Sequence, residues 1–268
     1  MLRPPAVAGR FYPANPTELS RQIAACAAPI GEPPRRAIAC VVPHAGYRYS
    51  GHVAGAVYAR LKLPRRILLL GPRHFPRGKD QAILSEGAWQ TPLGRAEIDS
   101  ELAHELRRAS PELCEDEVAH QTEHALEVQL PFLQFLSGDF RFVPIALATM
   151  EYVQLESLGR AIADVLRNQS DPVLMIASSD MNHYESDEIT RRKDRLALDR
   201  VLQLDARGLF DTVLREGITM CGFGPVVSVL TAAGLLGAAR ATLVRYATSG
   251  DINGDRDEVV GYAGVIVE

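Results

Sequence analysis

Three short apolar runs of this chain each end in a polar cluster that contains a histidine. The runs and their histidines are residues 37–42 with His44, residues 67–71 with His74, and residues 173–177 with His183. Because open α/β sheets bind ligands outside the carboxyl ends of their strands, three such ends can converge on one pocket. Imidazole nitrogens bind metal ions and also act as general bases. The pattern therefore predicts a metal-assisted or nucleophilic site at one edge of a sheet.

A cysteine adds a thiol to this set. Cys221 stands in the stretch Met-Cys-Gly-Phe-Gly-Pro at residues 220–225, a predicted turn before a helix of small residues. The N–H groups at a helix N-terminus stabilise a thiolate, which favours a reactive role for Cys221. Free cysteine is also a common packing residue, and that reading fits Cys26 in a predicted helix and Cys40 in a predicted strand.

The polar residues near the third run admit two readings. Asp180 could cap a following helix, a common use of aspartate after a strand. Because Asn182 and His183 accompany it within three residues, the trio favours a place in the pocket over capping alone. His44 and His74 occupy the same position in successive strand–helix units, so each strengthens the functional reading of the other.

His124 and Glu127 are three residues apart and would share one side of a predicted helix over residues 123–136. A role in binding substrate beside the site and a partly exposed helix surface are equally consistent with that spacing. His52, His104 and His120 follow no strand and have no polar cluster around them, so we expect surface or packing roles for them.

The elements that must position these residues alternate between strand and helix. Expected strands cover 37–42, 67–70, 140–147, 173–177, 241–247 and 261–267; expected helices begin near Asn15 and cover 52–61, 99–110, 123–136, 151–168, 187–203 and 222–237; residues 82–98 read as a hairpin or meander, and residues 30–34 end the first helix. Continuous apolar strands suit a sheet that is covered on both sides. The pattern predicts one α/β domain over residues 1–268, with a central, mostly parallel sheet covered by helices.

Composition excludes several classes of function. The net charge is −4, and no basic stretch interleaves with aromatic residues, so we expect no nucleic-acid partner. The four cysteines form no Cys-x-x-Cys pair, which argues against a disulfide framework or a zinc ribbon. No run approaches the roughly 18 apolar residues that a membrane span requires, and the N-terminus lacks a signal-peptide core. We expect a soluble, cytoplasmic protein without membrane contact.

Six motifs, in order along the chain, give a family resemblance. They are Pro43-His44-Ala45-Gly46-Tyr47 with Ser50-Gly51, Leu70-Gly71-Pro72-Arg73-His74, Thr91-Pro92-Leu93-Gly94, Glu123-His124-Ala125-Leu126-Glu127, Ser178-Ser179-Asp180-Met181-Asn182-His183 and Cys221-Gly222. With Ala8-Gly9-Arg10-Phe11-Tyr12-Pro13 near the N-terminus, the chain resembles the Memo family over nearly its whole length. Prokaryotic members are often called component B of the AmmeMemoRadiSam system. That name implies association with an AMMECR-type protein and a radical SAM protein.

The resemblance implies a fold like that of the class III extradiol dioxygenases, which use non-haem iron. His44, His74 and Cys221 match the metal-binding residues of the family, and Asp180 and His183 match polar residues of its pocket. The dioxygenases complete their two-histidine set with a carboxylate, whereas this chain has a thiol. The difference puts ring cleavage in doubt.

The chemistry of such a donor set follows from its residue types. Two imidazoles and one anionic ligand leave positions on a metal open, as in non-haem Fe(II) centres, and a thiolate makes Cu or Zn competitive with Fe(II). His183 would then be a general base, oriented by Asp180. Arg73 and Tyr47 would hold an anionic or aromatic substrate, either a small molecule or a peptide.

Three classes of function remain open. The first is a metal-dependent oxidoreductase or redox-linked metal site. The second is a metal-free hydrolase in which Cys221 attacks and His183 or His44 is the base. The third is a module that uses the same pocket to bind a peptide or a partner protein without catalysis. Metal analysis separates the first from the other two.

Overall fold

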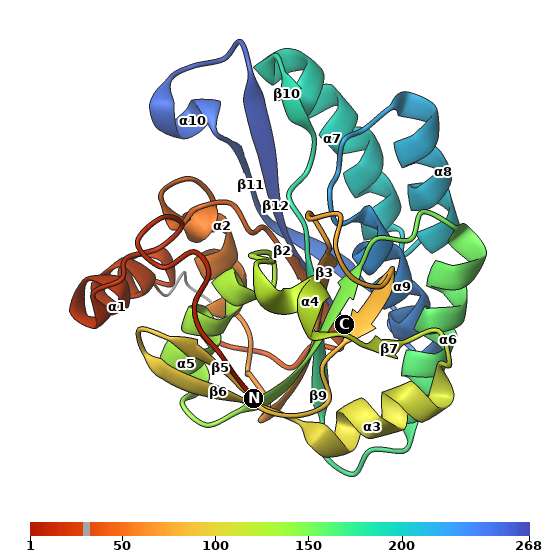
Figure 1. Cartoon of the computed structure of the whole chain (residues 1–268). Coiled ribbons are helices and arrows are strands. Elements are labelled where there is room, and N and C mark those ends of the chain that lie inside the picture. Colours follow the sequence, from red (N-terminus) through yellow and green to blue (C-terminus); the bar gives the residue numbers. More distant parts are fainter. Residues whose placement is uncertain (29–32) are drawn as a thin grey trace.

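The computed structural model describes residues 1–28 and 33–268 (Figure 1). Its strands are β1 (Leu2–Arg3), β2 (Ala39–Val42), β3 (Arg66–Pro72), β4 (Gln81–Ile83), β5 (Ala88–Thr91), β6 (Gly94–Ile98), β7 (Cys114–Glu115), β8 (Arg141–Leu147), β9 (Val173–Ser178), β10 (His183–Glu185), β11 (Ala241–Thr248) and β12 (Val259–Val267). Its helices are α1 (Pro16–Cys26), α2 (Tyr47–Tyr58), α3 (Ser100–Ala109), α4 (Glu117–Gln121), α5 (Leu130–Ser137), α6 (Tyr152–Arg167), α7 (Asp187–Leu202), α8 (Ala206–Glu216), α9 (Phe223–Leu235) and α10 (Gly250–Asn253), with a 3-10 turn at Glu127–Gln129.

These strands form one 12-stranded mixed sheet, in which the main order is β1-β5-β6-β8-β3-β9-β2-β12-β10. Its centre is parallel: β3 pairs with β8 on one side and with β9 on the other, and β9 also pairs with β2. Because β9 lies between β2 and β3, the two strands that lead to His44 and His74 are separated by the strand that leads to Ser178. The carboxyl ends of all three lie at the same edge.

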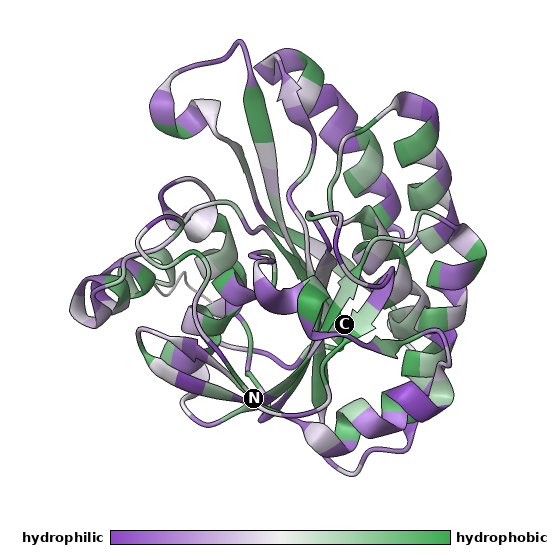
Figure 2. Cartoon of the chain, in the orientation of Figure 1, coloured by the Kyte–Doolittle hydropathy of each residue, from purple (hydrophilic) through white to green (hydrophobic). Residues whose placement is uncertain are grey.

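Successive residues of the central strands pack against two different helical layers. Leu68 and Leu70 of β3 belong to a core formed with α3, α6, α7, α8 and α9, whereas Ile67 and Leu69 belong to a second core formed with α1, α2 and α5. Figure 2 shows largely hydrophobic strands in the sheet and helices that alternate between hydrophobic and hydrophilic residues. Burial of both strand surfaces explains why the strands read as continuous apolar runs.

The mostly parallel sheet and most predicted elements are confirmed. The expected hairpin is present as the antiparallel pair β5 and β6, and β4 adds a further antiparallel contact with β8. The predicted end of the first helix at residues 30–34 falls partly outside the described residues, and α1 ends at Cys26. Helix α2 begins at Tyr47, five residues before the expected start at His52, and helix α8 was not predicted at all.

The predicted helix over residues 123–136 is confirmed over its second half, which is α5 (Leu130–Ser137), and is wrong over its first half. The chain at Glu123 and His124 is a loop, followed by the 3-10 turn and then by α5. Two local features explain this result. The Glu123 side chain accepts a hydrogen bond from the backbone N–H of Ala125, which competes with helical hydrogen bonding, and Pro131 suits the first turn of a helix rather than its interior.

Two glycines permit close approaches that position the layers. Gly55 of α2 lies against the backbone of Cys26, and a Cβ at this position would overlap the Cys26 carbonyl. Gly222, just before α9, lies against the Ser178 carbonyl and the Ser179 side chain. The second contact brings the start of α9 down onto the end of β9, and Cys221 comes with it.

Candidate metal centre

A cavity of ≈ 580 Å³ opens at the carboxyl edge of the central strands. The residues that line it come from seven segments of the chain: Phe11, His44, Ala45, Gly46, His74, His124, Asp180, His183, Tyr184, Thr219, Cys221 and Val260. His44 follows β2, His74 follows β3, and Cys221 precedes α9. The strand ends therefore converge as the sequence predicts.

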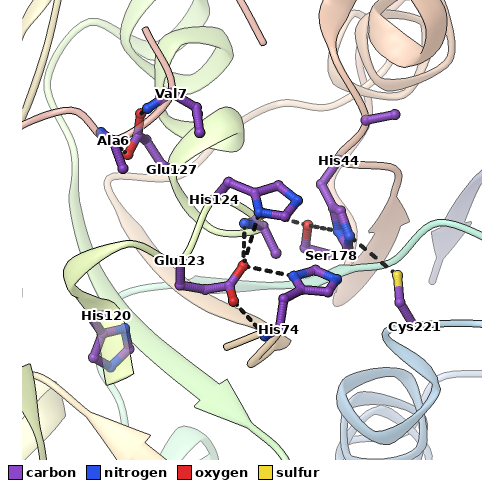
Figure 3. A network of polar contacts seen from close by, with 12 residues as sticks. Ala6, Val7, His44, His74, His120, Glu123, His124, Glu127, Ser178 and Cys221 are labelled. Atoms are coloured by element: carbon purple, nitrogen blue, oxygen red, sulfur yellow. Dashed lines mark hydrogen bonds and ion pairs between the residues drawn. The ribbon is translucent and has the colours of Figure 1, made fainter. Parts of the chain in front are cut away.

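The three predicted metal ligands lie together. One nitrogen each of His44 and His74 and the Sγ atom of Cys221 all lie within 4.8 Å of one another. Cys221 Sγ is 3.2 Å from Nε2 of His44, and the centroids of the two imidazole rings are 5.2 Å apart. Figure 3 shows these side chains pointing toward one space. A second group, which shares His74 and adds Glu123 and His124, meets the same distance criterion.

The hydrogen bonds around His44 fix which ring nitrogen carries the proton. The Ser178 hydroxyl donates to the carbonyl of Ala125 (2.7 Å) and accepts a bond from the Gln129 amide (2.9 Å). The remaining contact of Ser178 Oγ, at 3.0 Å from His44 Nδ1, must then be one in which the imidazole donates. His44 is consequently protonated on Nδ1 and presents the lone pair of Nε2 toward Cys221.

His74 is oriented in the same way by a carboxylate. Glu123 Oε1 lies 2.9 Å from His74 Nδ1, and Oε2 accepts a bond from the backbone N–H of His74 at 2.6 Å. An ionised carboxylate only accepts, so Nδ1 of His74 carries a proton, and the neutral ring then has its lone pair on Nε2. Carboxylates orient metal-binding histidines in many proteins through this contact.

Electrostatics keep these groups in the protonation states that metal binding needs. Burial, with the neighbouring His74, lowers the pKa of His44 well below its usual value, and burial with the neighbouring His44 lowers the pKa of His124 to about 4. Burial alone would raise the pKa of Glu123, but its bonds from His74 and Ala125 outweigh burial and hold the pKa at about 2. At neutral pH the imidazoles of His44 and His124 are thus neutral and the Glu123 carboxylate is ionised.

The prediction of a stabilised thiolate at Cys221 is wrong for the metal-free protein. Burial, reinforced by the negative charge of Asp180, raises the pKa of the thiol. The sulfur lies before the first residue of α9 and contacts the carbonyl of Asp180 at 3.7 Å, so the helix N-terminus does not offset its desolvation. The thiol is protonated unless a cation binds it.

Asp180 and His183 both line the cavity, but Asp180 does not orient His183 as predicted. Asp180 Oδ1 instead accepts bonds from the backbone N–H groups of His44 (2.8 Å) and Ala45 (3.3 Å), so it holds the loop after β2. It also caps no helix, because the N-cap of α7 is Ser186. His183 is held through Nδ1 by the carbonyl of Thr219 at 2.9 Å.

Of the four predicted substrate-binding residues, only His124 lines the cavity, where its ring stacks on His74 at 4.6 Å between centroids. Tyr47 is buried and donates to the carbonyl of Val128. Arg73 points away from the cavity and pairs with Asp80. Glu127 is fully buried and binds the N-terminal segment, as Figure 3 shows, so its predicted contact with substrate is wrong.

The three histidines that were expected to be surface or packing residues do not line the cavity. His120 is fully buried against Trp89, His52 is half-buried, and His104 is exposed. Burial lowers the pKa of His120 to about 4, so it packs as a neutral ring.

Sequence reasoning missed the residues that orient the site. Glu123, Ser178, Gln129 and Thr219 all hold an imidazole or a group bound to one. Glu123 and Ser178 stand inside the motifs that carry the family resemblance, and their positions beside His124 and at the end of a strand were the available signal. Phe11 was missed in the same way: it lines the cavity and contacts His124 at 4.6 Å between centroids.

Comparison with known proteins bears on the resemblance directly. A family model described as "Memo-like protein" matches residues 3–266. The chain belongs to the Memo family. A MEMO1 family protein of Methanopyrus kandleri is 42% identical over 279 residues, with 99% of each chain covered, and one of Methanosarcina acetivorans is 41% identical over 268 residues, with 100% of this chain and 99% of the other covered.

One solved structure has a fold similar to that of this chain. The crystal structure of an uncharacterized protein from Escherichia coli K12 matches with a TM-score of 0.51, covering 84% of this chain and 99% of the other. The sequence identity is 13%, so this likeness concerns the fold alone.

Within residues 1–28 and 33–268, none of the helices has the length and apolar character that crossing a bilayer demands.

Proposed function

We propose that this Memo family protein binds Fe(II), or alternatively Cu or Zn, through His44 Nε2, His74 Nε2 and Cys221 Sγ. The observation that carries the proposal is the orientation of the two imidazoles. The Nδ1–H group of His44 donates to Ser178, and that of His74 donates to Glu123. The Nε2 atoms of the two rings therefore remain available beside the thiol of Cys221. Ligand bonds of roughly 2.0–2.3 Å place donor atoms about 3–4 Å apart, so the observed donors need only small shifts.

The donor set also fits chemically. Metal ligands must be deprotonated, and the neutral tautomers of His44 and His74 that their Nδ1 contacts select offer Nε2 in that form, whereas the Cys221 thiol must release its proton on binding. The elevated pKa of this thiol in the metal-free protein makes metal affinity increase with pH. Three protein ligands leave coordination positions open toward the cavity, where His183 and His124 lie.

With a metal bound, the site would supply a redox-active Lewis acid with room for a substrate and oxygen. The protein residues would do the rest. His183 presents a free Nε2 to the cavity because Nδ1 is engaged by Thr219, so it can accept a proton from a bound substrate. Asp180 keeps His44 in place by holding the backbone of the loop that carries it.

The test is metal binding by protein purified without oxygen. Fe(II), Cu(I) and Zn are titrated into the parent and into His44→Ala and His74→Ala, and both variants should lose binding. His183→Ala should retain it, and His104→Ala is the matched control because His104 is exposed and does not line the cavity. Retention of metal by both ligand variants would overturn the proposal.

Variants of the thiol identify the metal class. Cys221→Ser should weaken Cu and Zn more than it changes folding, since a hydroxyl is a poor ligand for soft metals. Cys221→Asp should partly restore Fe(II) binding by supplying a carboxylate. Equal affinities of all three metals for parent and Cys221→Ser would show that sulfur is not a ligand.

A metal-free Cys/His hydrolase is the second candidate, because Cys221 Sγ lies 3.2 Å from His44 Nε2. The raised pKa of the thiol and the lowered pKa of His44 both disfavour the ion pair that such an enzyme uses. If Cys221→Ser abolished reaction with an activated thioester while every variant bound metal like the parent, the hydrolase would replace the metal proposal.

A further inference from the structure

A buried polar network adjoins His183. Asn182 and Asp194 are both fully buried. Asp194 Oδ1 accepts a bond from the backbone N–H of Asn182 (2.8 Å), and its Oδ2 accepts one from the hydroxyl of Tyr246 (2.7 Å). Asp194 thus anchors the residue next to His183.

The Asn182 side chain connects this anchor to Thr219. Its amide nitrogen is directed at two acceptors, Glu185 (2.7 Å) and Thr190 (3.3 Å), which settles the orientation of the amide group. Its oxygen accepts bonds from the backbone N–H and the hydroxyl of Thr219, at 3.1 and 3.2 Å. All polar atoms of the Asn182 side chain are therefore engaged in holding neighbouring segments.

Thr219 in turn holds His183 at two atoms. The backbone N–H of His183 donates to the Thr219 hydroxyl at 2.7 Å, and Nδ1 donates to the Thr219 carbonyl at 2.9 Å. A carbonyl has no proton to donate, so this contact is possible only when Nδ1 is protonated. The contact therefore selects the tautomer whose lone pair is on Nε2.

The backbone beside His183 is strained in support of this arrangement. Tyr184 has φ of 61°, a left-handed conformation that bulky residues rarely adopt, and the pairing of β10 with β12 is irregular between His183 and Glu185. Such conformations are unfavourable and persist only where surrounding structure imposes them. Here the bonds of His183 and Glu185 to the network impose it.

We propose that Asn182 is a positioning residue, which holds Thr219 against His183 and so keeps the imidazole in the tautomer that presents Nε2 to the cavity. The proposal rests on the function proposed above only in assigning His183 the role of base. Asn182 contacts neither the cavity nor the candidate metal ligands. A purely structural role for Asn182 would change stability without changing the tautomer.

The experiment measures ring ¹⁵N shifts of His183 by NMR in protein labelled at histidine, with His183→Ala used to assign the signals. In the metal-free parent, the two ring nitrogens of His183 should have widely separated shifts with the proton on Nδ1. In Asn182→Ala the shifts should converge as the tautomers interchange. The control Thr190→Val removes a contact of the Asn182 nitrogen and a bond to the carbonyl of Glu185, but no bond to Thr219 or His183, and should resemble the parent.

A second pair of variants decides the matter if Asn182→Ala does not fold. Thr219→Val removes the hydroxyl that accepts from the backbone N–H of His183 and contacts the Asn182 oxygen, so the ring ¹⁵N shifts of His183 should converge. Thr219→Ser keeps the hydroxyl and should retain the widely separated shifts of the parent. A parent-like tautomer in folded Asn182→Ala, or in Thr219→Val, would overturn the proposal. The Zn affinity of Asn182→Ala should stay within about twofold of that of the parent. The tautomer is measured in metal-free protein, so a parent that binds no metal would refute the proposed metal site and leave this inference standing.

Discussion

Replacement of Glu127 by glutamine tests whether this residue serves stability rather than ligand binding. Its carboxylate accepts four bonds: from Arg3 Nη1 (2.6 Å), from the backbone N–H groups of Ala6 (2.8 Å) and Val7 (3.0 Å), and from the Tyr12 hydroxyl (2.6 Å). An amide offers one oxygen and places N–H groups against donors. The N-terminal segment would lose its principal anchor.

The expected decrease in the free energy of unfolding follows from the burial of the ion pair between Arg3 and Glu127. Side chains of Arg3 and Glu127 are 4% and 0% exposed, so the glutamine variant leaves a buried guanidinium without its counter-charge. Breaking one side of such a pair destabilises a protein by about 3–5 kcal/mol. Arg3 retains the carbonyls of His120 and Glu123 as acceptors, which favours the lower end of this range.

Urea denaturation of the metal-free protein measures the effect as a shift of the midpoint at constant slope. Glu258→Gln is the matched control, because Glu258 is exposed. The free energy of unfolding of the double variant Arg3→Met with Glu127→Gln should fall by less than the sum of the decreases in the two single variants. The difference, which is the coupling energy of the pair, should be about 1–3 kcal/mol. Metal affinity of Glu127→Gln should equal that of the parent. Unchanged stability combined with lost ligand binding would refute the anchoring role.

Three further predictions concern the orienting carboxylate, a buried ring and a helix contact. Glu123→Gln should weaken Zn binding about 10–100-fold, because the proton on His74 Nδ1 loses its carboxylate acceptor; calorimetric affinity equal to the parent's would contradict this. The folded-state pKa of His120, about 4, lies below the unfolded value of 6.5, so the unfolded chain binds more protons and stability is lost as pH falls from 6.5 to 4. His120→Phe should remove about 3 kcal/mol of that acid-induced loss, and an unchanged acid profile would refute it. Gly55→Ala should destabilise by about 1–3 kcal/mol through overlap with Cys26, whereas Gly234→Ala, where the added Cβ meets nothing within 4 Å, should not destabilise; equal thermal midpoints would refute the difference.

Strand ends were the most informative part of the sequence. A continuous apolar run that stops at a polar cluster specifies both a buried strand and the edge at which its last side chain lies, so His44 and His74 could be placed together before the fold was known. Cys221 could be added as a candidate because it stands in a predicted turn before a helix, and its place among the metal ligands came from the family resemblance. Helix α8 escaped prediction because no motif drew attention to residues 206–216.

Contacts between distant segments could not be predicted. The assignment of Glu127 depended on a helical spacing from His124, and the helix does not exist at those residues. Glu123 holds His74 across a separation of 49 residues, and Thr219 holds His183 across 36, which local periodicity cannot reveal. Periodicity reports which side of an element is buried, whereas hydrogen-bond partners depend on how the elements are assembled.

The order of strands in the sheet also bears on how the chain is made. Strand β12, at residues 259–267, pairs with β2 near the other end of the sequence, and Cys221 meets His44 across 177 residues. Synthesis proceeds at about 5–20 residues per second. At the slower rate, tens of seconds pass between the synthesis of β2 and that of β12, and during this time the edge of β2 that pairs with β12 stays unpaired. An open edge of an apolar strand is a template for pairing with another chain. Nascent chains of this protein are therefore expected to need protection from aggregation until translation passes β12, and metal can be captured by the full donor set only after α9 has emerged.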